Sequence, residues 1–127
     1  MSRSIKLLLP YPPRQLNPNR KQHWAQKAKH AKSYRKTCMA MTRAALMQDK
    51  FELPGGKLPK GSVKLDIDFY PPDRRNRDDD NAMASFKAGR DGIAQALRCD
   101  DSIFRASPFL HSEPHPGGKV VVTITVR

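Results

Sequence analysis

Long apolar runs, cysteines and acidic side chains are all scarce in this chain of 127 residues. No apolar segment approaches the roughly 20 residues that span a bilayer, so we expect no membrane insertion. The apolar run at residues 5–9 is short and ends at Pro10, so it lacks the apolar core of a secretory signal. Two cysteines, Cys38 and Cys99, form neither a disulfide framework nor a metal motif, which indicates reduced thiols in a cytoplasmic protein.

The shortage of acidic residues leaves a strongly basic chain. It has 24 Lys and Arg against 12 Asp and Glu, a formal net charge of +12. Such a charge favours a nucleic acid or an anionic membrane surface as the partner. The length suits one hydrophobic core and is too short for two ordinary domains, so we expect a single domain over residues 1–127.

The apolar periodicity predicts four strands and two helices. Strands are expected at residues 4–9, 63–70, 104–110 and 119–126, and helices at residues 21–48 and 81–97. The proline-rich stretches at residues 10–13 and then 17–19 form a rigid, extended connection, and this segment is expected not to be helical. Asp80 is expected to cap the second helix, whose apolar side carries Ala82, Phe86, Gly89, Ile93 and Leu97.

The first predicted helix has an apolar face and a basic face. The expected apolar face consists of Trp24, Ala28, Ala31, Tyr34, Cys38, Met41 and Ala45. A basic stripe on a different face consists of Lys29, Lys32, Lys36 and Arg43. The stripe is explained either as a phosphate-binding surface or as an ordinary solvated helix face.

The few acidic residues are concentrated in one part of the sequence. Asp78, Asp79 and Asp80 are consecutive, and Asp100 and Asp101 follow the second predicted helix. In a strand-like segment, the side chains of Asp78 and Asp80 project to one side, as metal ligands do. Asp79 and Asp80 would also be explained by helix capping. Asp101 joins the same site if an adjacent strand returns it to that edge.

Lys87 is the candidate cation of this site. It follows Asp80 by two helical turns and would lie on the same helix face, about 10 Å along the axis. The alternative is a surface lysine paired with Asp91 at i+4. The four histidines show no zinc spacing, and Gly55-Gly56 and Gly117-Gly118 are too short for a phosphate loop.

Three longer motifs contain or adjoin these carboxylates. Pro72-Asp73-Arg74-Arg75-Asn76-Arg77-Asp78-Asp79-Asp80-Asn81 is followed by Phe86-Lys87-Ala88-Gly89-Arg90-Asp91-Gly92-Ile93 and Asp100-Asp101-Ser102. Together with residues 9–13, 17–20, 23–24 and 117–122, they resemble the RusA family of Holliday-junction resolvases. The resemblance implies a small dimeric α/β endonuclease that nicks four-way DNA junctions with magnesium. Periodicity and resemblance agree on one α/β (α+β) domain with a small mixed sheet and two principal helices.

The resemblance also implies roles for individual residues. Asp78 and Asp80 match the family's Arg-Asp-x-Asp-Asn carboxylates, and Asp101 matches the second aspartate of its Asp-Asp pair. Lys87 with Asp91 matches the family's lysine segment. The interval from Asp80 to Lys87 is three residues longer than in the best-known pattern, which moves the lysine by roughly 4.5 Å along the helix. Ala84, at the usual position, cannot substitute for it.

The resulting hypothesis is magnesium-dependent hydrolysis of branched DNA by a homodimer. Asp78, Asp80 and Asp101 would bind one or two Mg²⁺, with Mn²⁺ as a substitute, and Lys87 would neutralise charge on the phosphate. We expect a nucleoid-associated protein of phage or prophage origin that acts in recombination and repair. The alternatives are a non-enzymatic DNA-binding or architectural protein and a metal-dependent transferase acting on nucleotides. Flanking phosphates would be held by Arg74, Arg75, Arg77, Lys29, Lys32, Lys36 and Arg43.

Overall fold

The sheet is mixed and has four strands, as expected. A computed structural model describes residues 3–21, 23–75 and 77–126. The strand order is β1-β4-β2-β3. β2 and β3 are parallel, whereas β4 is antiparallel to both of its neighbours. The observed bounds agree with the predicted ones to within one residue: β1 Arg3–Leu9, β2 Val63–Tyr70, β3 Phe104–Leu110 and β4 Lys119–Val126.

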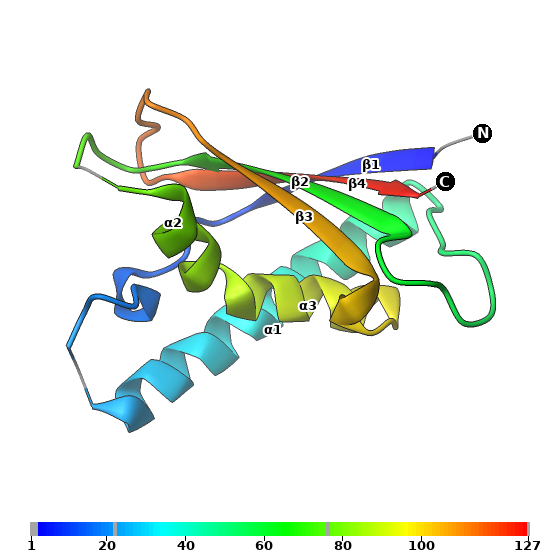
Figure 1. Ribbon diagram of the computed structural model, residues 1–127, viewed down its shortest axis with the longest axis horizontal. Helices are drawn as coiled ribbons and strands as arrows, with labels where there is room; N and C mark the ends of the chain where they lie inside the picture. Colours follow the sequence, from blue (N-terminus) through cyan, green and yellow to red (C-terminus); the bar gives the residue numbers. More distant parts are fainter. Residues whose placement is uncertain (1–2, 22, 76, 127) are drawn as a thin grey trace.

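The helices cover one face of this sheet (Figure 1). They are α1 (Trp24–Gln48), α2 (Asp79–Ser85) and α3 (Lys87–Leu97), with two short 3-10 turns, η1 (Arg14–Leu16) and η2 (Asp101–Ile103). Because β2 and β3 are parallel, the chain between them must return along the sheet, and α2 and α3 make that return. α2 therefore lies near the end of the sheet where β2 stops, and η2 lies near the opposite end, where β3 starts.

The core lies between the sheet and the helices. Alternate residues of β2 and β4 are buried, so one face of each strand packs on the helices. Phe86 is fully buried and packs edge-on against Tyr34 and Phe69. At Gly92 a Cβ atom would lie 2.5 Å from the carbonyl oxygen of Arg35, so α1 and α3 reach their observed separation only with glycine there.

The N-terminal part of α1 differs from the prediction. Trp24 is 76% exposed and Met41 is 41% exposed, whereas Thr42 is completely buried. The first turns of α1 extend past the end of α3 (Figure 1), so Trp24 has no helix to pack against. The buried face is Tyr34, Cys38, Thr42 and Leu46.

The second predicted helix is also different, because it is divided. α2 ends before Phe86, whose φ of −90° and ψ of 0° interrupt the helix, and α3 starts at Lys87. This bend places the ring of Phe86 in the core. The residue that caps α2 is Asp78, not Asp80 as predicted.

Two expectations about the whole chain can be compared with the structure. Within the described residues, no helix is long and apolar enough to cross a membrane. Cys38 and Cys99 are both free. Burial raises the pKa of each thiol to about 11, so both are protonated near neutral pH and neither resembles a reactive cysteine.

Candidate active site

The three consecutive aspartates lie where an extended segment becomes helix α2. Asp78 is extended, with φ of −126° and ψ of 162°. The backbone N–H of Asn81 donates to Asp78 Oδ1 at 2.7 Å, and Asn81 Nδ2 donates to Oδ2 at 3.1 Å. Such a cap stabilises a helix by about 1 kcal/mol. The same contacts fix the Asp78 carboxylate in one orientation.

Asp79 and Asp80 occupy the first turn of α2, and all three carboxylates are exposed. Among the described residues, no lysine or arginine makes an ion pair with Asp78, Asp79 or Asp80. The helix dipole favours negative charge at this end, but only by a fraction of a charge. The acidic segment therefore keeps most of its negative charge, which a bound cation would neutralise.

The arginines of the preceding loop are organised around a different carboxylate, Asp73. Arg77 Nη1 lies 2.8 Å from Asp73 Oδ1 and also donates to the carbonyl oxygens of Asp73 and Arg75. The Arg75 backbone N–H donates to Asp73 Oδ1 at 3.0 Å. The hydrogen bond from Arg77, followed by the one from Arg75, lowers the pKa of Asp73. Asp73 thus positions the two arginines beside the acidic segment.

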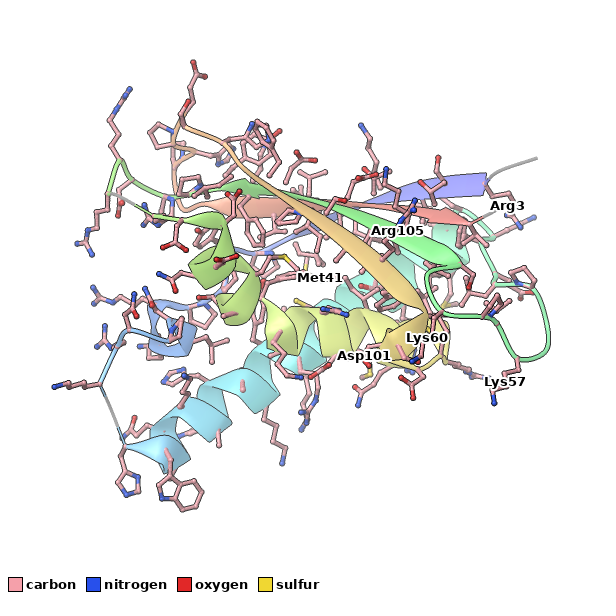
Figure 2. All side chains as sticks on the ribbon, in the orientation of Figure 1. Arg3, Met41, Lys57, Lys60, Asp101 and Arg105 are labelled. Carbon is pink, nitrogen blue, oxygen red and sulfur yellow. The ribbon has the colours of Figure 1, made fainter. Side chains whose placement is uncertain are left out.

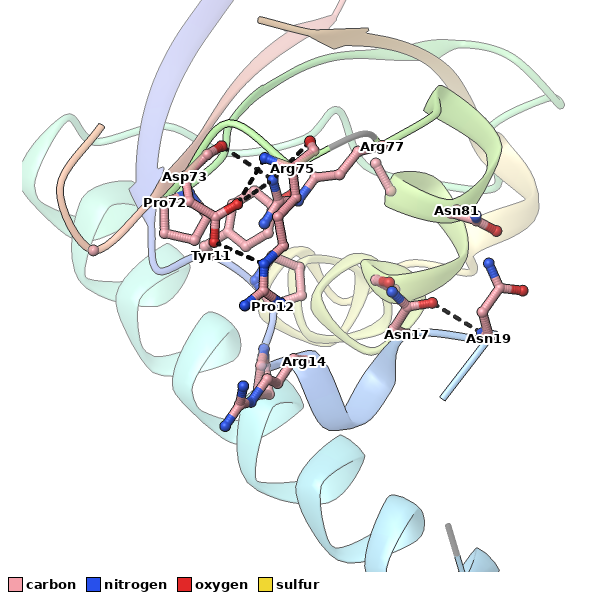
Figure 3. A pocket seen from close by; sticks show the side chains of 14 residues that line it. Tyr11, Pro12, Arg14, Asn17, Asn19, Pro72, Asp73, Arg75, Arg77 and Asn81 are labelled. Atoms are coloured by element: carbon pink, nitrogen blue, oxygen red, sulfur yellow. Dashed lines mark hydrogen bonds and ion pairs between the residues drawn. The ribbon is translucent and has the colours of Figure 1, made fainter. Parts of the chain in front are cut away.

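A cavity of about 490 Å³ adjoins these residues (Figure 3). Arg75, Arg77 and Asn81 line it from one side, and Arg14, Asn17 and Asn19 from the other; Tyr11, Pro12, Pro13, Pro72, Asp73, Ala82, Ser85 and Gly117 complete it. Asn81 thus joins the cavity to Asp78. An opening that is lined by three arginines and joined to Asp78 through Asn81 can accept a phosphate group next to a cation.

Sequence reasoning missed the contribution of the segment before α1. Arg14 lies in η1, and Asn17 and Asn19 follow it, with the Asn19 N–H donating to Asn17 Oδ1 at 2.9 Å. The proline-rich segment was expected to be extended and not helical, but Arg14–Leu16 forms a 3-10 turn within it. Its contact with the loop after β2 depends on tertiary structure. Arg74, by contrast, is exposed and does not line the cavity.

Within one chain the structure does not bring Asp101 to Asp78 and Asp80. Asp101 starts η2, just before Phe104, which pairs with Val63 at the start of β2. The acidic segment instead follows the end of β2, and the seven steps of ~3.3 Å between the first and last residues of this strand separate the two ends by roughly 23 Å. Figure 2 shows Asp101 beyond α3, away from α2. Among the described residues, no group of three or more His, Cys, Asp or Glu could hold a metal ion.

Lys87 does not have the position relative to Asp80 that a continuous helix would give it. It begins α3, after the interruption at Phe86. Its Nζ lies 3.8 Å from Asp91 Oδ2, and the side chain is 75% exposed. This contact is the i,i+4 surface pair that the alternative interpretation predicted, and its effect on stability is small. A catalytic role for Lys87 stays a prediction.

The basic stripe of α1 is exposed at each of its four positions, Lys29, Lys32, Lys36 and Arg43. The predicted separation of the basic face from the buried face is therefore confirmed. Exposure is required both for phosphate binding and for a solvated helix face, so the choice between them stays open.

Comparison with known proteins gives a relative whose name states no activity. No family model matches the chain. An uncharacterized protein of Xylella fastidiosa is 42% identical over 120 residues, which are 94% of this chain and 74% of that protein. At this identity and coverage, the chain belongs to the same protein family as the uncharacterized Xylella protein.

Proposed function

We propose that the chain is a magnesium-dependent endonuclease that nicks branched DNA, with four-way junctions as its substrate. The observation that carries this proposal is the acidic segment at the start of α2, exposed and without a basic partner among the described residues, beside a cavity lined by arginines. A basic surface attracts the polyanion, and carboxylates hold a cation against one phosphate. The choice of a four-way junction as the substrate is based on the resemblance to the RusA family.

The donor atoms of the acidic segment fit Mg²⁺. This ion prefers hard oxygen ligands and usually takes one or two carboxylates, with waters and substrate phosphates completing its shell. Asp78 and Asp80 would hold it, and Mn²⁺ would substitute. When bound, the ion would polarise a phosphate and lower the pKa of a coordinated water.

The chain's own residues would orient the DNA. Asn81 fixes the Asp78 carboxylate through two hydrogen bonds, and Asp73 fixes the Arg77 guanidinium. Groups held in place before the substrate arrives lose little entropy on binding. Arg77, Arg75 and Arg14 would then contact phosphates that flank the one being cut.

Asp101 lies at the opposite end of the sheet from Asp80. If Asp101 is a ligand of the same cation as Asp80, a second copy of the chain must supply it, because the two residues lie at opposite ends of one sheet. The proposed homodimer would meet this need through a twofold axis that gives two equivalent composite sites. Two sites related in this way match the two opposing strands of a junction.

A non-enzymatic DNA-binding protein is the second candidate. The observation that favours it is the capping of α2 by Asp78, which gives one of the three carboxylates a structural role. Capping needs one carboxylate, however, and the helix dipole gives Asp79 and Asp80 only a modest further stabilisation.

Incubation with labelled DNA decides between these candidates. Four-way junction, linear duplex and single strands are compared with and without Mg²⁺. We expect paired nicks on opposing strands of the junction, leaving 5′-phosphate and 3′-hydroxyl ends that ligase seals. A protein that shifts every DNA without cutting would be the binding protein, and equal cutting of linear duplex would leave a nuclease without junction selectivity.

Arg14 should contribute to DNA affinity and not to specificity. Arg14→Gln is expected to weaken junction binding about tenfold, since a charge-assisted hydrogen bond is worth roughly 1.5 kcal/mol. The slope of log K against log salt should fall by about 0.9 for the lost phosphate contact. Titrations at several salt concentrations measure both quantities.

Lys57→Gln is the matched control for Arg14→Gln. Lys57 lies in the loop between α1 and β2, at the other end of the sheet from α2 (Figure 2). Equal changes in the two variants would mean that Arg14 acts through net charge alone.

A further inference from the structure

Trp24 is the most exposed of the large apolar side chains described, at 76%. It is also the only tryptophan of the chain. A tryptophan is among the largest apolar side chains, and leaving its ring in water forfeits the stabilisation that burial would give. The site described above makes no use of it.

The indole ring is supported on one side by a neighbouring ring. The His23 and Trp24 rings are stacked, with centroids 5.7 Å apart and planes 27° apart. The His23 imidazole is itself held in place, because its Nδ1 accepts the Ala25 N–H at 3.2 Å as the N-cap of α1. His23 therefore backs one face of the indole, and most of the remaining ring surface is open to solvent.

The basic side chains around Trp24 favour an anionic ligand. All 12 acidic residues of the chain lie at position 49 or later, so the whole segment that includes η1 and most of α1 carries only basic charges. Arg20, Lys21 and Lys27 are the nearest of these in sequence. Flat aromatic rings among basic side chains are typical of surfaces on which nucleic acid bases stack.

A membrane surface fits these observations less well. A membrane-binding helix presents several large apolar side chains on one face. The next exposed one on α1, Met41, lies about 25 Å further along the helix at roughly 1.5 Å per residue. Trp24 thus stands alone among basic residues.

We propose that Trp24, backed by His23, is a stacking site for an unpaired or exposed nucleobase of the bound DNA. The proposal rests on the proposed function, which it deepens. α1 packs against η1, which carries Arg14 of the cavity, so the stacking site and the phosphate cavity are connected by a short segment of chain. DNA held in the cavity would reach Trp24 where its bases are no longer stacked on one another.

The single tryptophan makes the test direct. The full chain is titrated in EDTA, which prevents cleavage, with oligo(dT), with a four-way junction and with blunt duplex, while tryptophan fluorescence is followed. We expect strong quenching by oligo(dT) and by the junction and much less by duplex at equal occupancy. In a parallel anisotropy titration, Trp24→Leu should bind labelled oligo(dT) about tenfold more weakly, and Trp24→Phe should restore most of the affinity.

Met47→Leu is the matched control, since Met47 is 74% exposed at the other end of the same helix. Its affinity for oligo(dT) should equal that of the wild type. DNA binding without quenching, or wild-type affinity of Trp24→Leu, would overturn the stacking site and leave the proposed function standing. Absence of DNA binding at low salt would overturn both. A fluorescence change with anionic phospholipid vesicles equal to that with oligo(dT), or loss of self-association in Trp24→Leu, would reassign Trp24 to a membrane or to a second copy.

Discussion

Asp78→Asn is expected to abolish cleavage of a four-way junction while the protein stays folded and bound to DNA. Asparagine caps a helix about as well as aspartate, so α2 should keep its N-cap. The substitution nevertheless removes the negative charge that a magnesium ligand must supply. Even residues that only support a metal ligand change affinity or activity by roughly 10- to 100-fold, so we expect a loss beyond about 100-fold. Single-turnover cleavage with saturating enzyme measures it.

The Asp78→Asn protein should still bind the junction although it no longer cuts it. Junction affinity should be equal to that of the wild type or higher, because one negative charge has been removed near the phosphates. Asp80→Asn should behave in the same way. Asp49→Asn, which makes the same change of charge at the C-cap of α1, should cut normally. If Asp78→Asn cuts at the wild-type rate, Asp78 is only a helix cap, and its assignment as a metal ligand is wrong.

The strands could be predicted from the sequence because each carries its own signal. Val63, Leu65, Ile67 and Phe69 alternate with polar residues, and this alternation defines both the strand and its buried face. Pro71 and the turn at Gly117 and Gly118 mark where strands end or begin, since proline lacks a backbone donor and both glycines have positive φ. For these strands the local sequence was sufficient to predict where each strand begins and ends and which face is buried.

The helices were predicted less well because their faces depend on tertiary contacts. The periodicity placed Trp24 and Met41 on the buried face of α1, but α3 does not extend as far as Trp24. Likewise nothing in residues 81–97 indicated an interruption, since Phe86 bends the chain to reach Tyr34 and Phe69. A helix pattern reports which residues are apolar, not where the partner helix ends.

The candidate site was predictable in part. The acidic segment and the adjacent arginines are neighbours in sequence, so their proximity in space was expected. Arg14 and Asn17 enter the cavity from a distant segment, and no local signal connects them with Arg77. Asp101 is the opposite case: its place in the Asp-Asp pair suggested convergence within one chain, but its position before β3 places it at the far end of the sheet.

A mixture of two inactive variants should therefore recover activity. Asp80→Asn and Asp101→Asn are each expected to be inactive alone as homodimers. After subunit exchange, a heterodimer would contain one composite site with Asp80 from one chain and Asp101 from the other, and a second site with both substitutions. Random exchange makes half of the dimers heterodimeric, each with one good site, so about one quarter of the wild-type nicking rate should return. The products should be single nicks and not paired ones.

The control for this mixture uses two substitutions in the same segment. Asp78→Asn mixed with Asp80→Asn should stay inactive, because every composite site would then contain one defective acidic segment. Co-purification of the untagged variant with an affinity-tagged one establishes whether heterodimers have formed. If they form and the Asp80→Asn and Asp101→Asn mixture stays inactive, the two carboxylates do not complete one site across the dimer. If Asp101→Asn alone cuts normally, Asp101 is not a ligand, and the acidic segment of each chain must act with only water and phosphate completing the metal shell.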